Sequence, residues 1–387
     1  MPWLLTVIPC SLLISWLGGF VLRRYGPRWG LVDRPGARKV HDRPMPTSGG
    51  IAIWLGLIVP LAVLQGMLWL TFDARPAPQR APEVIAGLVA RDYLPEEIVR
   101  HLPGVWAQSG RLWTVLGGAT LVMLLGLADD RWKLPWWLRL VAEFILATAT
   151  VAAGFRLTVF IDIPILTWIL SALWIVALIN AFNMIDNMDG LSAGVAAIAC
   201  TILAAVMLLT PKELGGEPQL FVAGFFLLVL GALLGFLWHN WPPARLFMGD
   251  AGSYLIGYLL AVISMAATFA GEHTPRHAVL APLCALAVPI YDLVTVVTIR
   301  LRAGASPFVG DTRHFSHRLV ELGMTKAQAV LTIYLMAATC GLGALLLHQV
   351  DTFGAVVILL LVGCIVSLIA ILETTGRRAQ RRRNNKT

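Results

Sequence analysis

Acidic residues, with glycines or histidines nearby, occur in five short polar segments that interrupt a strongly apolar chain. The acidic and imidazole residues of these segments are Asp33 and Asp42, then Asp129 and Asp130, then Asp186 and Asp189, then Asp250, and finally Asp311, His314 and His317. Paired carboxylates suit a hard divalent cation. Mg²⁺ takes one or two carboxylates and completes its shell with water and phosphate oxygens.

Basic residues in or near the same segments suit a polyanionic ligand. They include Lys39, His41, Arg300, Arg302 and Arg318. The segment "GDAGS" also opens an apolar run, and the N-terminus of a helix favours an anion. Acids, bases and glycine-rich turns together predict phosphoryl transfer, in which positioning and charge neutralisation do most of the work.

Helical spacing refines the candidates in "GLADD" and "INAFNMIDNMDG". Adjacent Asp129 and Asp130 point about 100° apart on a helix, so one is expected to face the metal or phosphate while the other orients a neighbour. Asp186 and Asp189 are three residues apart and share a face. Asn180, Asn183 and Asn187 form a polar stripe. That stripe could hydrogen-bond either a ligand or a neighbouring helix.

The elements that must position these residues are membrane-spanning helices. The chain has 387 residues, of which 58% are hydrophobic and 13% charged, whereas soluble domains have about 25% charged residues. Its apolar blocks are about 20 residues long, enough to cross the hydrocarbon layer. We predict an all-α polytopic membrane protein with about 11 transmembrane helices, near residues 3–22, 49–70, 112–128, 136–154, 160–180, 190–210, 219–238, 251–270, 278–299, 327–347 and 353–373.

All five polar segments follow odd-numbered spans and should therefore reach the same membrane face. The connections on that face, with the C-terminal tail, contain 22 of the 30 Lys and Arg residues. By the positive-inside rule this face is cytoplasmic, so the N-terminus should lie outside and the C-terminus inside. The net charge of +8 then indicates topology and anionic lipid, not nucleic acid.

We expect one transmembrane domain over residues 1–376, with an extracytoplasmic loop inserted at about 72–111, and a basic cytoplasmic tail over 377–387. The pair Gly231 and Gly235 has the spacing of a helix-packing face. The oligomeric state stays open between a monomer and a homodimer.

These motifs resemble those of the polyprenyl-phosphate N-acetylhexosamine-1-phosphate transferases, also called glycosyltransferase family 4. In chain order the matching motifs are "DRPGARKVHDRPMPTSGGIAI", "GLADD", "INAFNMIDNMDGLSAG", "RLFMGDAGS", "PIYDLVTVVTIRLRAG" and "DTRHFSHRL". They extend from residue 33 to about 319, and several such motifs in a fixed order are highly specific. The resemblance implies a helical bundle with a cytoplasmic-face cleft open sideways to lipid.

The last motif is similar to that of the branch using UDP-N-acetylglucosamine. The branch using the muramoyl-pentapeptide nucleotide instead has consecutive histidines. Two positions depart from the usual pattern: Ser316 replaces a middle histidine, and Asn187 replaces a common glycine. The departures leave the sugar open, although the acidic positions are intact. A phospho-MurNAc-pentapeptide transferase is therefore the alternative within the family.

The resemblance also implies roles for single residues. It makes Asp250 a Mg²⁺ ligand, with Mn²⁺ as a substitute, and lets Asp129 and Asp130 place the metal or the carrier phosphate. Asp186 and Asp189 would position the nucleotide and its phosphates. The residues expected to contact the diphosphate, the sugar or the incoming phosphate are Lys39, His41, Asn183, Asn187, Arg300, Arg302, His314, His317 and Arg318.

The expected reaction joins a UDP-N-acetylhexosamine to undecaprenyl phosphate in a bacterial inner membrane and releases UMP. The second pKa of a phosphate monoester is about 6, so the lipid phosphate is mostly dianionic at pH 7 and a general base is unnecessary. We favour single displacement over a covalent aspartyl-phosphate route.

An ion-coupled transporter is the hypothesis from another class. Asp292 and Glu143 lie within predicted spans, where buried charges are costly and tend to be functional. Against it, the acids gather at one face and no repeat relates the two halves of the chain.

Overall fold

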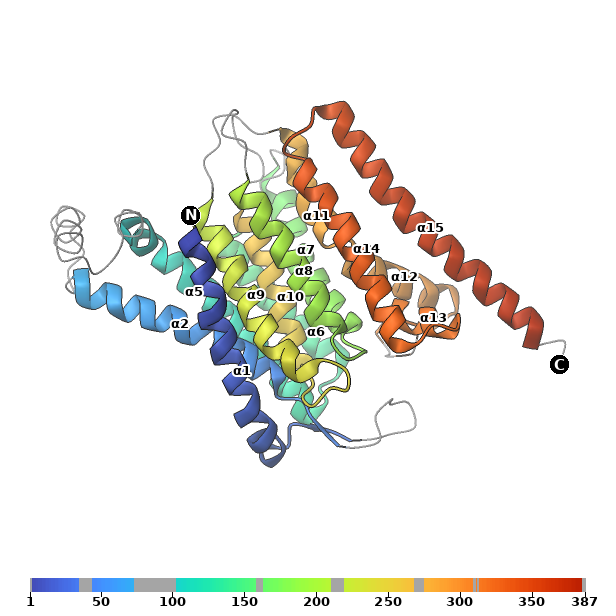
Figure 1. Ribbon diagram of the computed structural model, residues 1–387, viewed down its shortest axis with the longest axis horizontal. Coiled ribbons are helices and arrows are strands. Elements are labelled where there is room, and N and C mark those ends of the chain that lie inside the picture. The colour runs from blue at the N-terminus through green and yellow to red at the C-terminus, as the bar shows by residue number, and fades with distance from the viewer. Residues whose placement is uncertain are drawn as a thin grey trace.

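The computed structural model of the protein describes residues 2–34, 44–72, 102–157, 163–209, 219–267, 275–308, 311 and 313–384. The fold is a bundle of long helices (Figure 1). The helices are α1 (Val7–Tyr25), α2 (Gly49–Phe72), α5 (Leu102–Trp132), α6 (Trp136–Ala152), α7 (Pro164–Ile185), α8 (Leu191–Leu208), α9 (Leu220–Asn240), α10 (Gly249–Ala266), α11 (Ala281–Ala285), α12 (Ala287–Arg302), α13 (Phe315–Glu321), α14 (Lys326–Leu346) and α15 (Thr352–Asn384).

The prediction of an all-α polytopic membrane protein is confirmed. Within the described ranges, nine helices are long and apolar enough to cross a membrane. The segment Arg276–Ala285 and α12 would together form a tenth span, bent by 68°. The predicted span near 136–154 is present as α6, which has 17 residues. Each expected span therefore coincides with a helix, although one is short and one is broken.

The helix α10 lies at the centre of the bundle and packs against α2, α5 and α7. Two glycines allow the closest of these approaches. A Cβ at Gly126 of α5 would collide with the backbone of α10 at Ala251, and a Cβ at Gly257 of α10 would collide with α7 at Ile179. Because Gly126 lies one turn before Asp129 and Asp130, the close approach also sets these acids beside the start of α10.

The predicted packing face on α9 is confirmed by its contact with α1. A Cβ at Gly231 or Gly235 would collide with the α1 backbone at Ile8 or Leu12. Small residues let helix backbones approach closely in membranes, where van der Waals packing replaces the hydrophobic effect as the attractive force.

The connection between α9 and α10 is fastened to the connection between α1 and α2. Strands β1 (Val32–Asp33) and β2 (Met45–Pro46) form a short antiparallel pair. The N–H of Phe247 donates to the carbonyl of Pro46 at 2.8 Å, and the N–H of Gly49 donates to the carbonyl of Phe247 at 3.0 Å. These bonds fix the start of α10 against the start of α2.

The C-terminal part of the chain packs more loosely. The helix α14 packs on α8 and α11, and α13 lies beside the lower half of α14 (Figure 1). The helix α15 is mostly exposed and runs along the outside of the bundle, from the top of the view to the C-terminus at the lower right. Among the candidate spans of the described residues, α15 is the least buried and α10 the most buried.

Candidate active site

Five aspartates from α5, the α7–α8 turn and α10 meet at one end of the bundle. They are Asp129, Asp130, Asp186, Asp189 and Asp250, and we call them the acidic cluster. Their electrostatic neighbours include one another: Asp250 lies close enough to influence Asp129, Asp130 and Asp186. The expectation that these segments converge on one end of the bundle is therefore confirmed for the acidic cluster.

Asp130 holds the first turn of α10. Its carboxylate accepts the backbone N–H groups of Asp250 and Ala251, both at 3.2 Å. Gly249 begins α10 with a φ of 71°, a conformation that side chains with a Cβ rarely adopt, and a Cβ there would approach Asp130. A carboxylate at a helix N-terminus is favourable because it accepts otherwise unpaired N–H groups and faces the positive end of the dipole.

Asp129 points to a different set of partners. It is buried and accepts from Arg139 Nη1 at 2.5 Å, from the Leu134 N–H at 2.8 Å and from the Tyr254 hydroxyl at 3.3 Å. Adjacent Asp129 and Asp130 thus serve different neighbours, as helical spacing predicted. Asp129 lies close enough to Asp250 for the two carboxylates to repel each other, and a cation bound between them would relieve that repulsion.

Asn183 orients Asp250. Its Nδ2 donates to Asp250 Oδ1 at 2.7 Å and to Ser253 Oγ at 3.2 Å. One turn earlier, Asn180 Nδ2 donates to Glu143 Oε2 at 2.5 Å. For these two members of the asparagine stripe, the alternative of bonding to a neighbouring helix is therefore confirmed. It also gives buried Glu143 a structural partner.

Asp186 and Asp189 lie in the turn between α7 and α8. Partial burial, together with the carboxylates of Asp250 and Asp189, raises the pKa of Asp186 to about 8. Asp189 Oδ2 accepts the N–H of Ala244 at 3.0 Å, from the connection that precedes α10. A site in which carboxylates raise one another's pKa favours a cation that relieves the repulsion.

The residues present fit a magnesium site only in part. No group of three or more His, Cys, Asp or Glu side chains at metal-ligand distances occurs in the described part of the chain. Mg²⁺ needs few protein ligands, because it keeps several waters and binds substrate phosphates. Asp250, with Asp129 nearby, could supply such ligands.

Of the predicted histidines, His317 lies on α13, a seven-residue helix, and His314 is the residue immediately before it. His314 Nδ1 is 2.9 Å from Asp292 Oδ2, and the N–H of Phe315 donates to Asp292 Oδ1 at 2.6 Å. Ser316 Oγ donates to Asn187 Oδ1 at 2.5 Å, beside Asp186. The two positions that depart from the family pattern therefore contact each other.

His317 is half-buried, with its ring centroid 6.3 Å from that of His314. Burial and the nearby His314 lower the pKa of His317 below its usual value of 6.5. The ring is therefore neutral at pH 7 and keeps one N–H that can donate a hydrogen bond.

The arginines predicted to bind a polyanion lie elsewhere. Arg300 makes a two-point ion pair with Asp311, at 3.2 and 3.1 Å, and Arg318 pairs with Glu373 of α15 at 3.0 Å. Burial alone would raise the pKa of Asp311, but the hydrogen bonds from Arg300 and from the N–H of Arg313 lower it below the usual value. Both buried arginines thus occupy structural ion pairs, while Arg302 is exposed at the end of α12.

Lys39 and His41 fall outside the described residues, as does Asp42. Most of the predicted extracytoplasmic loop, residues 73–101, falls outside them as well.

Two residues with direct contacts to the site were not among the predicted site residues. Arg139 was counted only as a topology-determining charge, although it follows Asp129 by ten residues and opens the next helix. Asp292 was considered as a transporter relay, yet it holds His314 and the start of α13. The "PIYDLV" motif was the available signal for Asp292.

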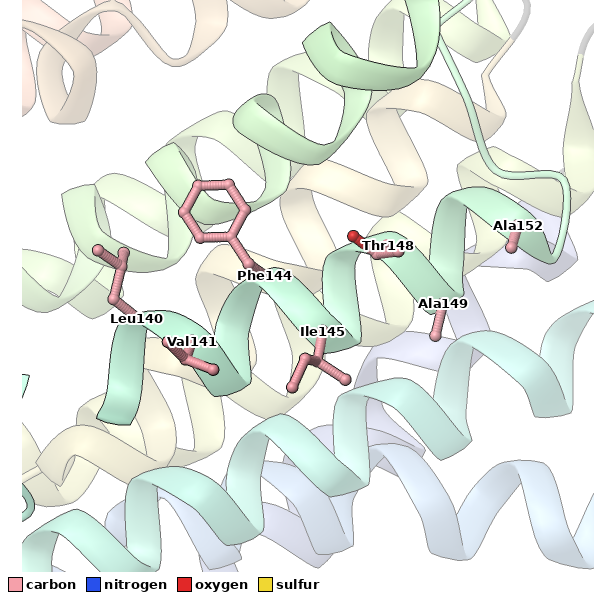
Figure 2. A pocket seen from close by; sticks show the side chains of 7 residues that line it. All are labelled: Leu140, Val141, Phe144, Ile145, Thr148, Ala149 and Ala152. Atoms are coloured by element: carbon pink, nitrogen blue, oxygen red, sulfur yellow. The ribbon is translucent and has the colours of Figure 1, made fainter. Parts of the chain in front are cut away.

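A hollow of about 540 Å³ follows one face of α6, next to Arg139 in sequence. It is lined by Leu140, Val141, Phe144, Ile145, Thr148, Ala149 and Ala152. Figure 2 shows these side chains spaced along the helix, and all are apolar except Thr148. An apolar groove on the outside of a membrane bundle suits a hydrocarbon chain. The charged Arg139 directly precedes Leu140, the first of the lining residues in the sequence.

The fold and the site define a multi-span, all-α membrane protein with clustered carboxylates at one end. The profile of glycosyl transferase family 4 matches residues 112–268, which include the whole acidic cluster but not α13. Comparison with curated proteins finds a decaprenyl-phosphate N-acetylglucosaminephosphotransferase of Mycolicibacterium smegmatis, 30% identical over 91% of this chain and 85% of the relative. The chain therefore belongs to glycosyl transferase family 4 and is a membrane transferase.

Two further relatives extend the comparison. The undecaprenyl-phosphate alpha-N-acetylglucosaminyl 1-phosphate transferase of Escherichia coli (strain K12) is 30% identical over 82% of this chain and 77% of the relative. A probable undecaprenyl-phosphate N-acetylglucosaminyl 1-phosphate transferase of Bacillus subtilis (strain 168) is 28% identical over 92% of this chain and 87% of the relative.

Proposed function

We propose that the protein transfers N-acetylglucosamine 1-phosphate from UDP-N-acetylglucosamine to a polyprenyl phosphate, most simply undecaprenyl phosphate, and releases UMP. This would be the first membrane step in the synthesis of a cell-surface glycan. The observation that supports it most strongly is the convergence of five aspartates around the start of α10 in a family 4 transferase. The printed names of the relatives give the same sugar phosphate and the same class of acceptor.

Mg²⁺ is the proposed cofactor, with Mn²⁺ as a substitute, and Asp250 and Asp129 are the proposed protein ligands. When bound, the ion would neutralise charge on the diphosphate of the sugar nucleotide. Asn183 holds the Asp250 carboxylate in place, and Asp130 holds the helix turn from which Asp250 projects. Because the Asn183 amide is a neutral donor, its hydrogen bond leaves the negative charge of Asp250 available to a cation.

The acceptor is proposed to lie with its chain in the α6 groove and its phosphate at Arg139. Arg139 uses Nη1 for Asp129, so the other guanidinium nitrogens can bind phosphate oxygens. An oxygen of the dianionic lipid phosphate attacks the β-phosphorus of the nucleotide. The bond from that phosphorus to the oxygen shared with the α-phosphate breaks, and UMP leaves with the electron pair.

The donor is proposed to lie between the acidic cluster and α13. The neutral His317 would donate a hydrogen bond to the diphosphate or the sugar, and His314, held by Asp292, would lie beside it. Asp186 and Asp189 would position the nucleotide and its phosphates. Lys39 and His41 are proposed to contact phosphate at the entrance to the site.

We also propose that the protein lies in the bacterial inner membrane with the acidic cluster and the C-terminus in the cytoplasm. The distribution of Lys and Arg supports this orientation, and the soluble nucleotide donor requires it.

The test is an assay of the purified protein in nanodiscs. Undecaprenyl phosphate, Mg²⁺ and UDP-N-acetylglucosamine labelled in the sugar and in the β-phosphate are supplied together. Both labels are expected in the lipid fraction, with one UMP released per lipid formed. Parallel reactions contain UDP-N-acetylgalactosamine or UDP-MurNAc-pentapeptide. Labelled lipid from the pentapeptide donor alone would replace the proposal with the alternative branch, and no labelled lipid from any donor would refute it.

A further inference from the structure

The last helix, α15, is attached to the bundle at few points. Large apolar side chains along it, including Leu360, Leu361 and Leu368, are more than half exposed. Glu373 is the opposite case, because it is charged and only 4% exposed although it lies on this lipid-facing helix. A carboxylate on an apolar helix is costly and needs partners.

Glu373 has two such partners. Its Oε2 accepts from Arg318 Nε at 3.0 Å and from the Tyr291 hydroxyl at 3.0 Å. Arg318 is itself 1% exposed, and its guanidinium lies 5.9 Å from the ring centroids of both Tyr291 and Phe315. The guanidinium carbon is thus enclosed by two aromatic rings and one carboxylate.

The remaining nitrogens of Arg318 are also bonded. Nη1 donates to the carbonyl of Arg313 at 2.6 Å, and Nη2 donates to Thr295 Oγ1 at 3.0 Å. Arg318 therefore ties α13 to α12, to α15 and to the segment that leads into α13. Its position one turn after His314 and next to His317 makes it part of the same short helix.

Besides its packing on α14, three positions of this helix make hydrogen bonds to side chains of other elements in the described part of the chain. Asp292 of α12 holds its first residue, Asn187 of the α7–α8 turn holds Ser316, and Glu373 holds Arg318. A seven-residue helix is unstable alone, so its placement depends on such contacts. Glu373 is the attachment farthest from the acidic cluster in the chain and belongs to the least buried helix.

We infer that Glu373, acting through Arg318, positions the histidines of α13 for the donor nucleotide, which makes the last transmembrane helix part of the donor site. The inference rests on the proposed function for the identity of the donor. Glu373 touches no substrate in this account, so it is a positioning residue and not a catalytic one. A purely structural anchor would affect stability and both substrates alike.

The kinetic test compares Glu373→Gln, Glu373→Asp and the neighbouring Thr374→Ala in nanodiscs. Thr374 is a matched control, because it is exposed and its hydroxyl bonds only within α15. For Glu373→Gln we expect the KM for UDP-N-acetylglucosamine to rise about tenfold, with the KM for the polyprenyl phosphate unchanged. Glu373→Asp should recover part of the loss, and Thr374→Ala should match the wild type.

A second variant is needed if Glu373→Gln does not fold because it leaves the buried Arg318 without a charged partner. Replacing both partners, as Arg318→Met with Glu373→Met, avoids an unpaired buried charge. The donor KM should still rise about tenfold. An unchanged donor KM in this variant, or equal changes in both KM values, would overturn the inference.

Hydrogen exchange tests the contact without relying on the reaction. In Glu373→Gln, the amides of Phe315–Glu321 should exchange about tenfold faster, while those of α10 stay as in the wild type. If the wild type shows no transfer, the proposed function fails while this measurement still decides whether Glu373 positions α13. Unchanged exchange in α13 would refute the positioning role even in an active enzyme.

Discussion

The acidic cluster and the α13 region differ in how their charges are balanced. In the α13 region, each of three charged or imidazole side chains has an opposite partner: His314 with Asp292, Arg300 with Asp311, and Arg318 with Glu373. In the acidic cluster only Asp129 has an ion-pair partner, Arg139, among the described residues. Asp250 is held by the amide of Asn183, and Asp130 and Asp189 are held by backbone N–H groups.

This difference indicates that the α13 region is a rigid structural element and that the acidic cluster is a binding site. Charges that are already paired give a rigid arrangement and leave little attraction for a ligand. Carboxylates that face one another without cations are unfavourable until a cation arrives, so part of the binding energy comes from relief of that repulsion. We therefore assign the divalent cation and the pyrophosphate to the acidic cluster, and orientation of the donor to α13.

The largest effect should follow from a change in the acidic cluster itself. Asp250→Asn keeps the shape of the side chain but removes its charge, and we expect transfer to fall about a thousandfold. Asp351→Asn, an exposed position in the turn before α15, is the matched control and should stay active. The measurement is kcat for lipid-linked product in nanodiscs. Near wild-type turnover in Asp250→Asn would contradict the assignment of the divalent cation and the pyrophosphate to the acidic cluster.

The Arg139 side chain tests the one ion pair of the acidic cluster. Arg139→Ala should raise the KM for the polyprenyl phosphate by about 10- to 100-fold, because a charge-assisted hydrogen bond to phosphate is lost. For Arg139→Lys, the KM for the polyprenyl phosphate should lie between the values for the wild type and Arg139→Ala. Arg24 is an exposed residue of α1, and Arg24→Ala should leave this KM unchanged. The donor KM should stay constant throughout. An equal rise in the KM for the donor would contradict the assignment of Arg139 to the polyprenyl phosphate.

The charge imbalance should also appear in the pH dependence of stability. In a chelator, folded Asp186 keeps a proton that the unfolded chain has lost, since its pKa is raised from 3.8 to about 8. The free energy of unfolding therefore falls as pH rises between these values. Added Mg²⁺ favours the ionised form and should raise Tm by about 2 to 5 °C more at pH 8 than at pH 5.

Thermal unfolding in nanodiscs with and without Mg²⁺ measures this effect. Asp186→Asn should flatten the pH dependence in the chelator. A Mg²⁺-induced rise in Tm that is the same at both pH values would speak against a cation at the acidic cluster.

The smallest effect concerns the contact that joins the two regions. Removing the Ser316–Asn187 hydrogen bond by either alanine substitution should lower kcat/KM severalfold, with a coupling of about 1 kcal/mol in the double-mutant cycle. Ser316→His should lower kcat/KM further, because the ring must fit beside Asn187, and adding Asn187→Gly should restore part of it. Strict additivity of the two alanine variants would show that the contact is not used.

The sequence predicted that the aspartates after the odd-numbered spans share one face, and five of them meet there, but it did not predict that Arg300 pairs with Asp311. Asp129, Asp186 and Asp250 each adjoin an apolar span, so counting spans places them on one face. The partner of Arg318 is Glu373, on a different helix and 55 residues away, which no local pattern indicates. Hence Arg300 and Arg318 were expected to bind a ligand, whereas the structure gives them internal partners.

The sequence analysis also did not predict one helix break and one contact between helices. The break between α11 and α12 lies within an apolar run that hydropathy treats as one span, although α11 ends at Ala285, four residues before Pro289, where proline disrupts a helix. The contact between Arg139 and Asp129 depends on how α6 lies against α5, which is a tertiary property.

Binding of Mn²⁺, followed by electron paramagnetic resonance, tests most directly whether the acidic cluster holds a cation beside a pyrophosphate. With UDP-N-acetylglucosamine present, the wild type and Asp351→Asn should each bind one Mn²⁺ per chain, and Asp250→Asn should bind none at the same free concentration. Equal Mn²⁺ binding by Asp250→Asn and the wild type would contradict the account.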